Sequence, residues 1–171
     1  MADIDRIIAE MGPALMRVAA AYERDPGLRE DLLQDMLIAI SRSLPRLRDA
    51  AKLKPFVFRI AHNKGVDHVA RHAGEPQTEQ APEDLPRPDG SPEEHMIARQ
   101  RAERLQAAVR RLELPYRQVI ALLLEDLTYT EIAETLGIGV SNVGARPVGL
   151  QGADEVVTHD PAGSSAAAWR G

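Results

Sequence analysis

Aromatic and cationic side chains are mixed in the segment from Arg46 to His72. This segment has seven Lys or Arg residues against two acidic ones, although the whole chain carries a formal net charge of −5. Aromatic faces can stack on unpaired bases at about 1–3 kcal/mol per base, while cations contact phosphates and an amide can pair with a base edge. The residue types therefore predict binding of single-stranded DNA by Phe56, Phe58, Arg59, His62, Asn63 and Arg71.

A structural role for some of these residues is the simpler alternative. Phe56 and Phe58 are two positions apart, so on a helix they point in nearly opposite directions and we expect at least one of them in the core. His62 and His68 are six positions apart, which does not match the i, i+4 spacing of a helical metal pair. We therefore expect no metal site.

Residues 128–146 have the pattern of a DNA-binding helix-turn-helix. Thr130 can cap a first helix, Gly137 can end it, and Ser141 can cap the second helix, which in such motifs enters the major groove. Pro147 should end that second helix after about one and a half turns, because proline lacks a donor and clashes with the preceding turn. The candidates for DNA contact are Thr130, Ser141, Asn142 and Arg146.

A third candidate surface is polar and lies on one face of an expected helix. Its residues follow an i, i+3, i+4, i+7 spacing: Asp31, Gln34, Asp35 and Ile38. Two carboxylates on one face could bind a basic protein surface. The alternative is an ordinary solvated face on which Arg29 and Arg42 are the partners.

The elements that must position these residues are helices, and we predict an all-α fold of two small helical domains. Apolar residues recur at helical spacing in 2–24 (interrupted at Gly12-Pro13), 28–44, 52–72, 93–112 and 115–125. Residues 74–94 contain five prolines and many acids, which predicts a flexible linker between domains 1–73 and 95–146. Residues 147–171 have no helical period and should form a disordered tail.

Several function classes lack support in the sequence. There is no cysteine, no Gly-rich phosphate loop and no constellation typical of catalysis, so we expect neither an enzyme nor a cofactor. No signal peptide and no apolar stretch of membrane-spanning length is present, so a soluble cytoplasmic protein without membrane insertion is expected.

Three ordered motifs resemble the extracytoplasmic-function (ECF) sigma factors of the sigma-70 family. The first is Glu30-Asp-Leu-Leu-Gln-Asp35, and the second is Pro55-Phe-Val-Phe-Arg-Ile-Ala-His-Asn63 with Val66-Asp-His68. The third joins Leu112-Glu-Leu-Pro-Tyr-Arg-Gln-Val-Ile-Ala-Leu122 to Tyr129-Thr-Glu-Ile-Ala-Glu-Thr-Leu-Gly137. The resemblance covers about residues 10–72 and 95–146, and the order of the motifs makes it more specific than a lone helix-turn-helix.

The resemblance implies a function and a set of partners. Residues 1–73 would be sigma region 2, which binds core RNA polymerase and reads and melts the −10 promoter element. Residues 95–146 would be sigma region 4, which reads the −35 element. The Asp31–Ile38 surface would bind the β′ clamp of the polymerase, the segment 46–72 would bind −10 DNA, and residues 128–146 would bind −35 DNA. Further partners would be the β flap and an anti-sigma factor.

The sequence departs from the family in two places. Phe56 stands where the family usually has Trp, which preserves an aromatic face. After Arg146 the family continues its basic recognition helix, whereas here Pro147 and an unrelated tail follow. We interpret the abrupt change as an altered or frameshifted 3′ end, with a genuinely divergent tail as the alternative.

The altered end leaves other functions open. One is a sigma-like decoy or truncated product that binds core polymerase or an anti-sigma factor without efficient −35 recognition. Another is a stand-alone helix-turn-helix regulator, although neither residues 55–63 nor the Glu30–Asp35 motif serves the reading of duplex DNA.

Overall fold

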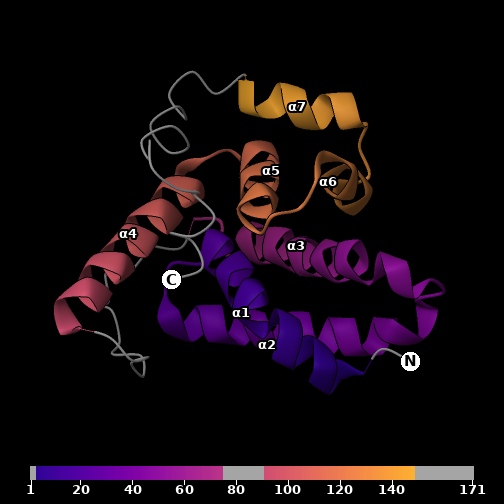
Figure 1. The fold of residues 1–171 in the computed structure, drawn as a ribbon, viewed down its shortest axis with the longest axis horizontal. Helices are drawn as coiled ribbons and strands as arrows, with labels where there is room; N and C mark the ends of the chain where they lie inside the picture. Colours follow the sequence, from indigo (N-terminus) through magenta and orange to yellow (C-terminus); the bar gives the residue numbers. More distant parts are fainter. Residues whose placement is uncertain (1–2, 75–90, 149–171) are drawn as a thin grey trace.

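The chain folds into α-helices without a strand in the residues that the structure, a computed structural model, describes: 3–74 and 91–148. Two short 3₁₀ turns connect α2 to α3 (Figure 1). The helices are α1 (Ile4–Tyr22), α2 (Pro26–Ser43), α3 (Leu53–Arg71), α4 (Pro92–Arg111), α5 (Leu114–Leu124), α6 (Tyr129–Leu136) and α7 (Val140–Val148). The predicted all-α fold is thus confirmed, and the predicted bounds of the first five helices agree with these to within two residues at each end.

Helices α1, α2 and α3 pack against one another and form the first bundle. Asp3 caps α1, and Asp25 caps α2 directly before Pro26, which occupies the first helical position. Two polar contacts join α1 to α3 inside this bundle. The Tyr22 hydroxyl lies 2.5 Å from His62 Nδ1, and Glu23 Oε2 lies 2.5 Å from His68 Nε2.

Helix α1 continues through Pro13, so the predicted interruption at Gly12-Pro13 is wrong. Proline removes one backbone donor, but here its ring lies on the exposed side of the helix. On the other side Ile7 and Leu15 are fully buried, one before and one after the proline. Packing of this face holds both halves of α1 in one helix.

Helices α4 to α7 form the second half, with the helix-turn-helix in α6 and α7. Helix α6 is capped by Thr128. The Thr128 hydroxyl accepts a hydrogen bond from the Glu131 amide, while the Glu131 carboxylate accepts one from the Thr128 amide. The helix ends at Gly137, which has a φ of 67° in the left-handed region. The cap therefore lies at Thr128 and not at Thr130, which is an exposed residue of the first turn.

Helix α7 also differs from its prediction. It begins at Val140, so Ser141 lies within the first turn and is not the cap. It continues through Pro147 to Val148, because a proline in the last turn removes only one hydrogen bond before the helix ends. The predicted linker, residues 74–94, and the predicted tail, residues 147–171, lie mostly outside the described residues. The exceptions are residue 74, residues 91–94 around the start of α4, and residues 147–148 at the end of α7.

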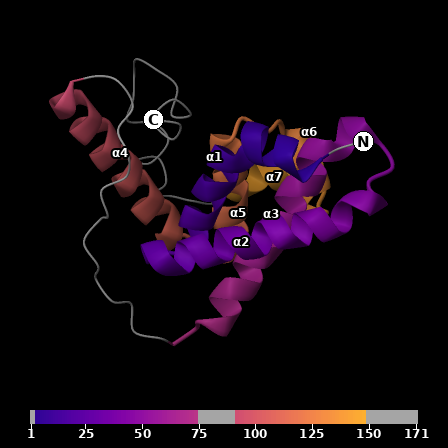
Figure 2. The same ribbon diagram turned by 90° about the horizontal axis from the view of Figure 1, so that it is seen from below.

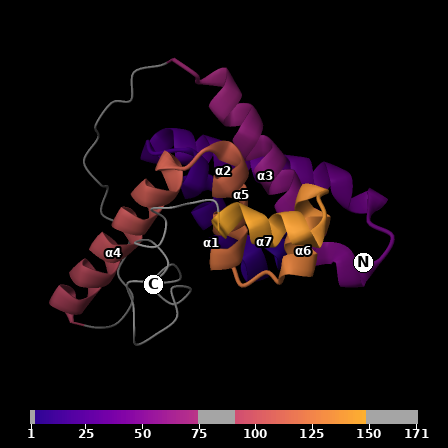
Figure 3. The same cartoon turned by 90° about the horizontal axis from the view of Figure 1, so that it is seen from above.

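The two halves are packed on each other. Helix α6 contacts α3, and α4 and α5 contact α1, so that buried residues of both halves belong to one apolar cluster. Figure 1 shows the resulting layers: α7 lies outermost, α5 and α6 lie beneath it, and the first bundle follows. Viewed from below, the first bundle covers α5 to α7 (Figure 2), and viewed from above, α6 and α7 face the reader (Figure 3).

Candidate polymerase and nucleic-acid interfaces

The polar face of α2 is exposed as its spacing predicts. Leu32, Met36 and Ile40 point into the bundle and are buried. The opposite face carries Asp31, Gln34, Asp35 and Ile38, all of them exposed. Ile38 keeps 49% of its surface accessible and lies one turn after Asp35. A surface of two acids, an amide and one aliphatic residue is suited to a basic protein partner with an apolar contact.

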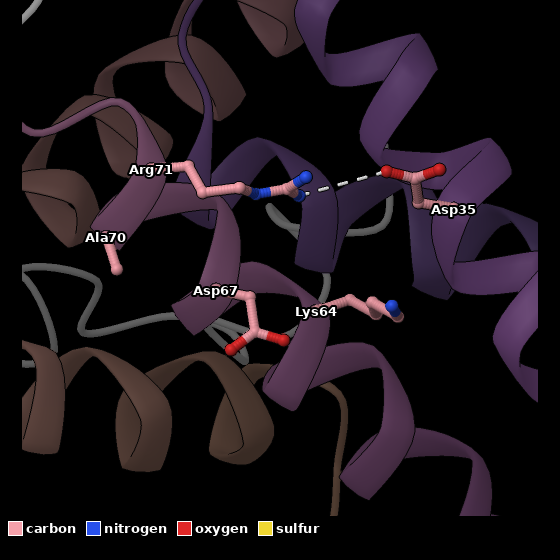
Figure 4. Close-up of a pocket in the computed structure, with 5 residues that line it drawn as sticks. All are labelled: Asp35, Lys64, Asp67, Ala70 and Arg71. Carbon is pink, nitrogen blue, oxygen red and sulfur yellow. Dashed lines mark ion pairs between the residues drawn. The ribbon is translucent and has the colours of Figure 1, made fainter.

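A shallow charged hollow connects α2 to α3 (Figure 4). It is lined by Asp35, Lys64, Asp67, Ala70 and Arg71. Arg71 Nη2 lies 3.9 Å from Asp35 Oδ2, and both side chains are more than half exposed. Such a pair contributes at most about 1 kcal/mol, so either partner can exchange it for another ligand at little cost.

This hollow joins two predicted surfaces, because Asp35 belongs to the predicted protein interface and Arg71 to the predicted DNA interface. Lys64 and Asp67 were not predicted for either surface. Their spacing with Arg71 on one helix, at i, i+3 and i+7, was the available signal. Asp35 therefore faces both predicted surfaces, since it also lies within ion-pair distance of Arg71 on α3.

The residues predicted to bind single-stranded DNA on α3 divide into an outer and an inner group. Arg59 and Asn63, four residues apart, are exposed on one face, and Arg71 is exposed near the end of the helix. Phe58 and His62, also four residues apart, point into the bundle and are 2% and 1% exposed. Phe56 is half-buried. The expectation that one of the two phenylalanines belongs to the core is confirmed, and it is Phe58.

Burial also determines the charge of His62. The ring is enclosed beside Tyr22 in an edge-to-face arrangement, with the centroids 5.4 Å apart. Burial lowers the pKa of His62 to about 3 and raises the pKa of Tyr22 above its usual value. His62 is therefore neutral at physiological pH and offers no cation to a phosphate. We leave Phe58 and His62 out of the candidate DNA interface, which is a correction of the sequence prediction.

The outer face of α7 is the candidate surface for duplex DNA. Val143 is buried against α5 and α6, whereas Ser141, Asn142 and Ala145 are exposed. Gly144 lies beside the Tyr129 ring of α6, and an added Cβ there would meet Tyr129 Cε2 at 3.4 Å. The backbone at Arg146 is helical, but its side chain lies outside the described residues. The amide of Asn142 and the hydroxyl of Ser141 can donate to phosphates or base edges.

The described residues contain neither a cluster of metal-ligating side chains nor a candidate membrane span. No group of three or more metal-ligating side chains occurs among them. In the same part of the chain, no helix combines the length and the apolar character that crossing a membrane requires.

Comparison with known protein families matches both halves of the chain separately. Residues 7–75 match the family described as Sigma-70 region 2, and residues 102–146 match Sigma-70, region 4. The second match ends at Arg146, the residue after which the tail begins.

Two relatives that are similar to this chain are named as sigma factors. The "ECF RNA polymerase sigma factor SigE" of Mycolicibacterium smegmatis is 29% identical over 146 residues, which cover 83% of this chain and 56% of the relative. The "RNA polymerase sigma factor SigZ" of Bacillus subtilis is 27% identical over 123 residues, covering 71% of this chain and 68% of the relative. The chain thus spans little more than half the length of the mycobacterial protein.

Proposed function

We propose that this chain, which belongs to the ECF group of the sigma-70 family, directs core RNA polymerase to promoters and helps to melt them. The observation that carries the proposal is the presence of both sigma regions in one chain, each with an exposed polar surface of the appropriate chemistry. Sigma factors are generally non-enzymatic regulators, and we assign no catalytic activity or cofactor to this one.

The exposed face of α2 is the proposed site for core polymerase. Asp31, Gln34, Asp35 and Ile38 would contact the β′ clamp, with the two carboxylates meeting cations and Ile38 meeting an apolar side chain. The first domain, proposed as residues 1–73, presents this face without rearrangement. An anti-sigma factor and the β flap are further proposed partners, and the cytoplasm is the proposed location because polymerase and DNA are there.

The exposed residues of α3 are the proposed −10 site. Arg59 and Arg71 would follow phosphates, while the Asn63 amide pairs with the edge of an unpaired base. Half-buried Phe56 supplies the remaining aromatic face. Holding an unpaired base outside the stack is what favours the melted promoter.

The helix-turn-helix in the proposed second domain, residues 95–146, is the proposed −35 site. Thr130 and Arg146 would contact the backbone, and Ser141 and Asn142 would reach the groove from the first turn of α7. This site is short. The family match ends at residue 146, and this observation favours a second candidate function, a sigma-like decoy that occupies core polymerase without efficient −35 recognition.

Charge reversal on α2 tests the polymerase-binding proposal. We expect the double substitution Asp31→Lys and Asp35→Lys to weaken binding to core polymerase by about tenfold or more, since each carboxylate would face a cation of the clamp. The measurement is the dissociation constant for core polymerase at moderate salt. Both residues are exposed, so helical content should not change.

Glu93→Lys with Glu94→Lys is the matched control. These acids are exposed in the first turn of α4, far along the chain from α2, and their reversal changes the net charge by the same amount. Affinity should stay within about twofold of the parent, a difference of only ~0.4 kcal/mol. Equal losses in both double variants, or no loss in either, would refute the α2 site.

A further inference from the structure

The outward face of α7 is largely aliphatic. Val143 is fully buried. Ser141 and Ala145, two positions before and after Val143, point to the opposite side, because two residues turn a helix by about 200°. Val140, the first residue of the helix, keeps 48% of its surface accessible. Helix α7 is also the outermost layer in Figure 1 and faces the reader in Figure 3, so this surface is accessible in the free chain.

Two polar side chains accompany the aliphatic ones at the start of α7. A Cβ built on Gly139 would lie 3.8 Å from Ser141 Oγ and 3.8 Å from Asn142 Nδ2, so both groups lie beside the first turn of the helix. In the part of the chain that the structure describes, no hydrogen bond occupies the Asn142 amide. An Asn amide in the major groove can pair with N6 and N7 of adenine, to which it accepts and donates at once.

The described side chains of α7 include no cation. Guanine is read in the major groove mainly by Arg or Lys, which donate to its O6 and N7. Residues 140–145 contain neither, and the side chain of Arg146 lies outside the described residues. The proposed function assigns Arg146 to the DNA backbone. Guanine therefore has no partner of the usual kind among the described side chains of this helix.

An exposed aliphatic side chain that enters the major groove needs an apolar partner. The C5 methyl group of thymine is the one methyl group that the bases present there, and small apolar side chains contact it. Removing both groups from water is favourable. Tyr129 of α6, 46% exposed and adjacent to Gly144, extends the apolar surface beside Val140. The aliphatic residues and Asn142 thus favour the same base pair, since thymine supplies the methyl group and adenine the partners of the amide.

The length of α7 limits how many base pairs it can read. Its nine residues span about 13 Å at 1.5 Å per residue, which is the height of about four base pairs at 3.4 Å each. Val140 and Ala145 are about 7.5 Å apart along the helix axis, or about two base-pair steps. Asn142 lies between them. One helix along the groove can therefore contact two thymine methyl groups and an adenine within a single short run.

We propose that α7 selects a short run of A·T pairs as the −35 element of this chain, with Val140 and Ala145 on thymine methyl groups and the Asn142 amide on adenine. The proposal rests on the proposed sigma function and names the base pairs that its −35 site reads. Ser141 can pair with any base edge and adds no preference. A run of about four pairs without a required G·C pair gives weak selection, so the −10 element supplies most of the promoter specificity.

Sequencing of duplexes bound from a randomised pool tests the proposal with the full chain. The chain and the pool are mixed at low salt, where DNA binding is strongest, and bound duplexes are compared with the input. We expect runs of three to four A·T pairs to be enriched by about tenfold, as the sum of several small preferences. Replacing thymine in an enriched duplex by deoxyuridine, which lacks only the C5 methyl group, should weaken binding about threefold at each contacted position.

Variants at exposed positions assign the contacts. Val140→Ser removes the aliphatic side chain and should abolish the effect of deoxyuridine at one position. Asn142→Ala should lower the preference for adenine at one base pair by about fivefold. Met96→Ser in α4 is the matched control, because Met96 is 60% exposed and lies outside the helix-turn-helix, and it should leave every base preference unchanged. Circular dichroism verifies that each variant keeps its helices.

Several results would overturn the proposal. One is a bound pool without A·T enrichment, and another is enrichment of G·C pairs. An equal response of the parent chain and Val140→Ser to deoxyuridine is a third. If Val140→Ser leaves the base preference intact but weakens binding to core polymerase, the apolar residues form a protein contact and the proposal fails.

Transcription with core polymerase separates this proposal from the sigma function. If the bound pool shows the A·T preference but the chain yields no new 5′ ends with core polymerase, the sigma function fails and the readout by α7 stands. If new 5′ ends appear but neither their −35 sequences nor the bound pool is rich in A·T pairs, the function stands and the readout fails.

Discussion

Gly65 occurs in the middle of α3 because the Tyr22 ring of α1 lies directly against it. A Cβ built on Gly65 would be 2.4 Å from Tyr22 Cδ2, closer than any real contact. Tyr22 cannot move aside easily, since it is buried and hydrogen-bonded to His62. The glycine is therefore required by the packing of two helices, although glycine weakens a helix by about 1 kcal/mol relative to alanine.

Gly65→Ala should consequently lower the free energy of unfolding by about 1–3 kcal/mol, the usual cost of overpacking. Helix propensity alone would give the opposite sign. Urea unfolding followed by circular dichroism measures the difference. Gly144→Ala in α7 is the comparison, because its Cβ would meet Tyr129 at an ordinary 3.4 Å, and it should be neutral or stabilising. Equal effects at the two glycines would mean that Tyr22 does not exclude a side chain at residue 65.

Individual residues show which parts of the candidate site the sequence could predict. The shared face of Asp31 and Asp35 follows from helical spacing alone, because apolar residues on the same helix fix which side is inward. Phe58 and His62 were misassigned because their residue types suit DNA binding. Their i, i+4 spacing places them on one face, but the partner that accommodates His62 is Tyr22, 40 positions earlier in the sequence.

At the scale of elements, α7 is the weakest part of the proposed promoter reader. It has nine residues, from Val140 to Val148, and its last turn contains Pro147. The sequence beyond residue 147 offers one arginine and three acids, whereas the salt-dependent part of phosphate binding needs cations. Each phosphate contact contributes about 0.9 to the slope of log affinity against log salt. A helix with Arg146 as its one cation should bind DNA with a shallow salt dependence.

We therefore expect the full chain to bind a −35 duplex barely above nonspecific background. Replacing residues 147–171 with a basic amphipathic helix should tighten binding markedly and steepen the slope by about 0.9 for each added contact. Fluorescence anisotropy at several salt concentrations measures both quantities. Specific binding of the unaltered chain at submicromolar affinity in physiological salt would contradict the prediction and require the tail to contact DNA.

The element bounds could be predicted well because capping residues and apolar periods are local signals. Gly137 marks a helix end as predicted, but the predicted starts of α2 and α6 lie two residues late, because the caps are Asp25 directly before Pro26 and Thr128 with Glu131. The misplaced boundary at Pro13 has a tertiary cause, since buried residues on both sides of the proline maintain α1. Prolines are reliable stops only where packing does not override them.

At the scale of the whole molecule, the arrangement of the two regions could not be predicted from the sequence. Arg17 of α1 and Glu125, the residue that follows α5, form an ion pair although they are 108 positions apart in the sequence. Their pairing depends on the packing of α5 against α1, which involves side chains from both regions. Local patterns determine the helices. The contacts between the two regions depend instead on how side chains that are far apart in the sequence fit together.

The central claim is that this chain gives core polymerase promoter specificity, and transcription in vitro tests it most directly. Genomic DNA of the source organism would be transcribed by core polymerase with and without the chain, and the 5′ ends of the transcripts would be sequenced. We predict new 5′ ends that share a −10 motif, a weaker common sequence at −35, and fewer such ends with Asn63→Ala although core binding is retained. A chain that binds core polymerase but adds no new 5′ ends would contradict the claim and identify it as a decoy.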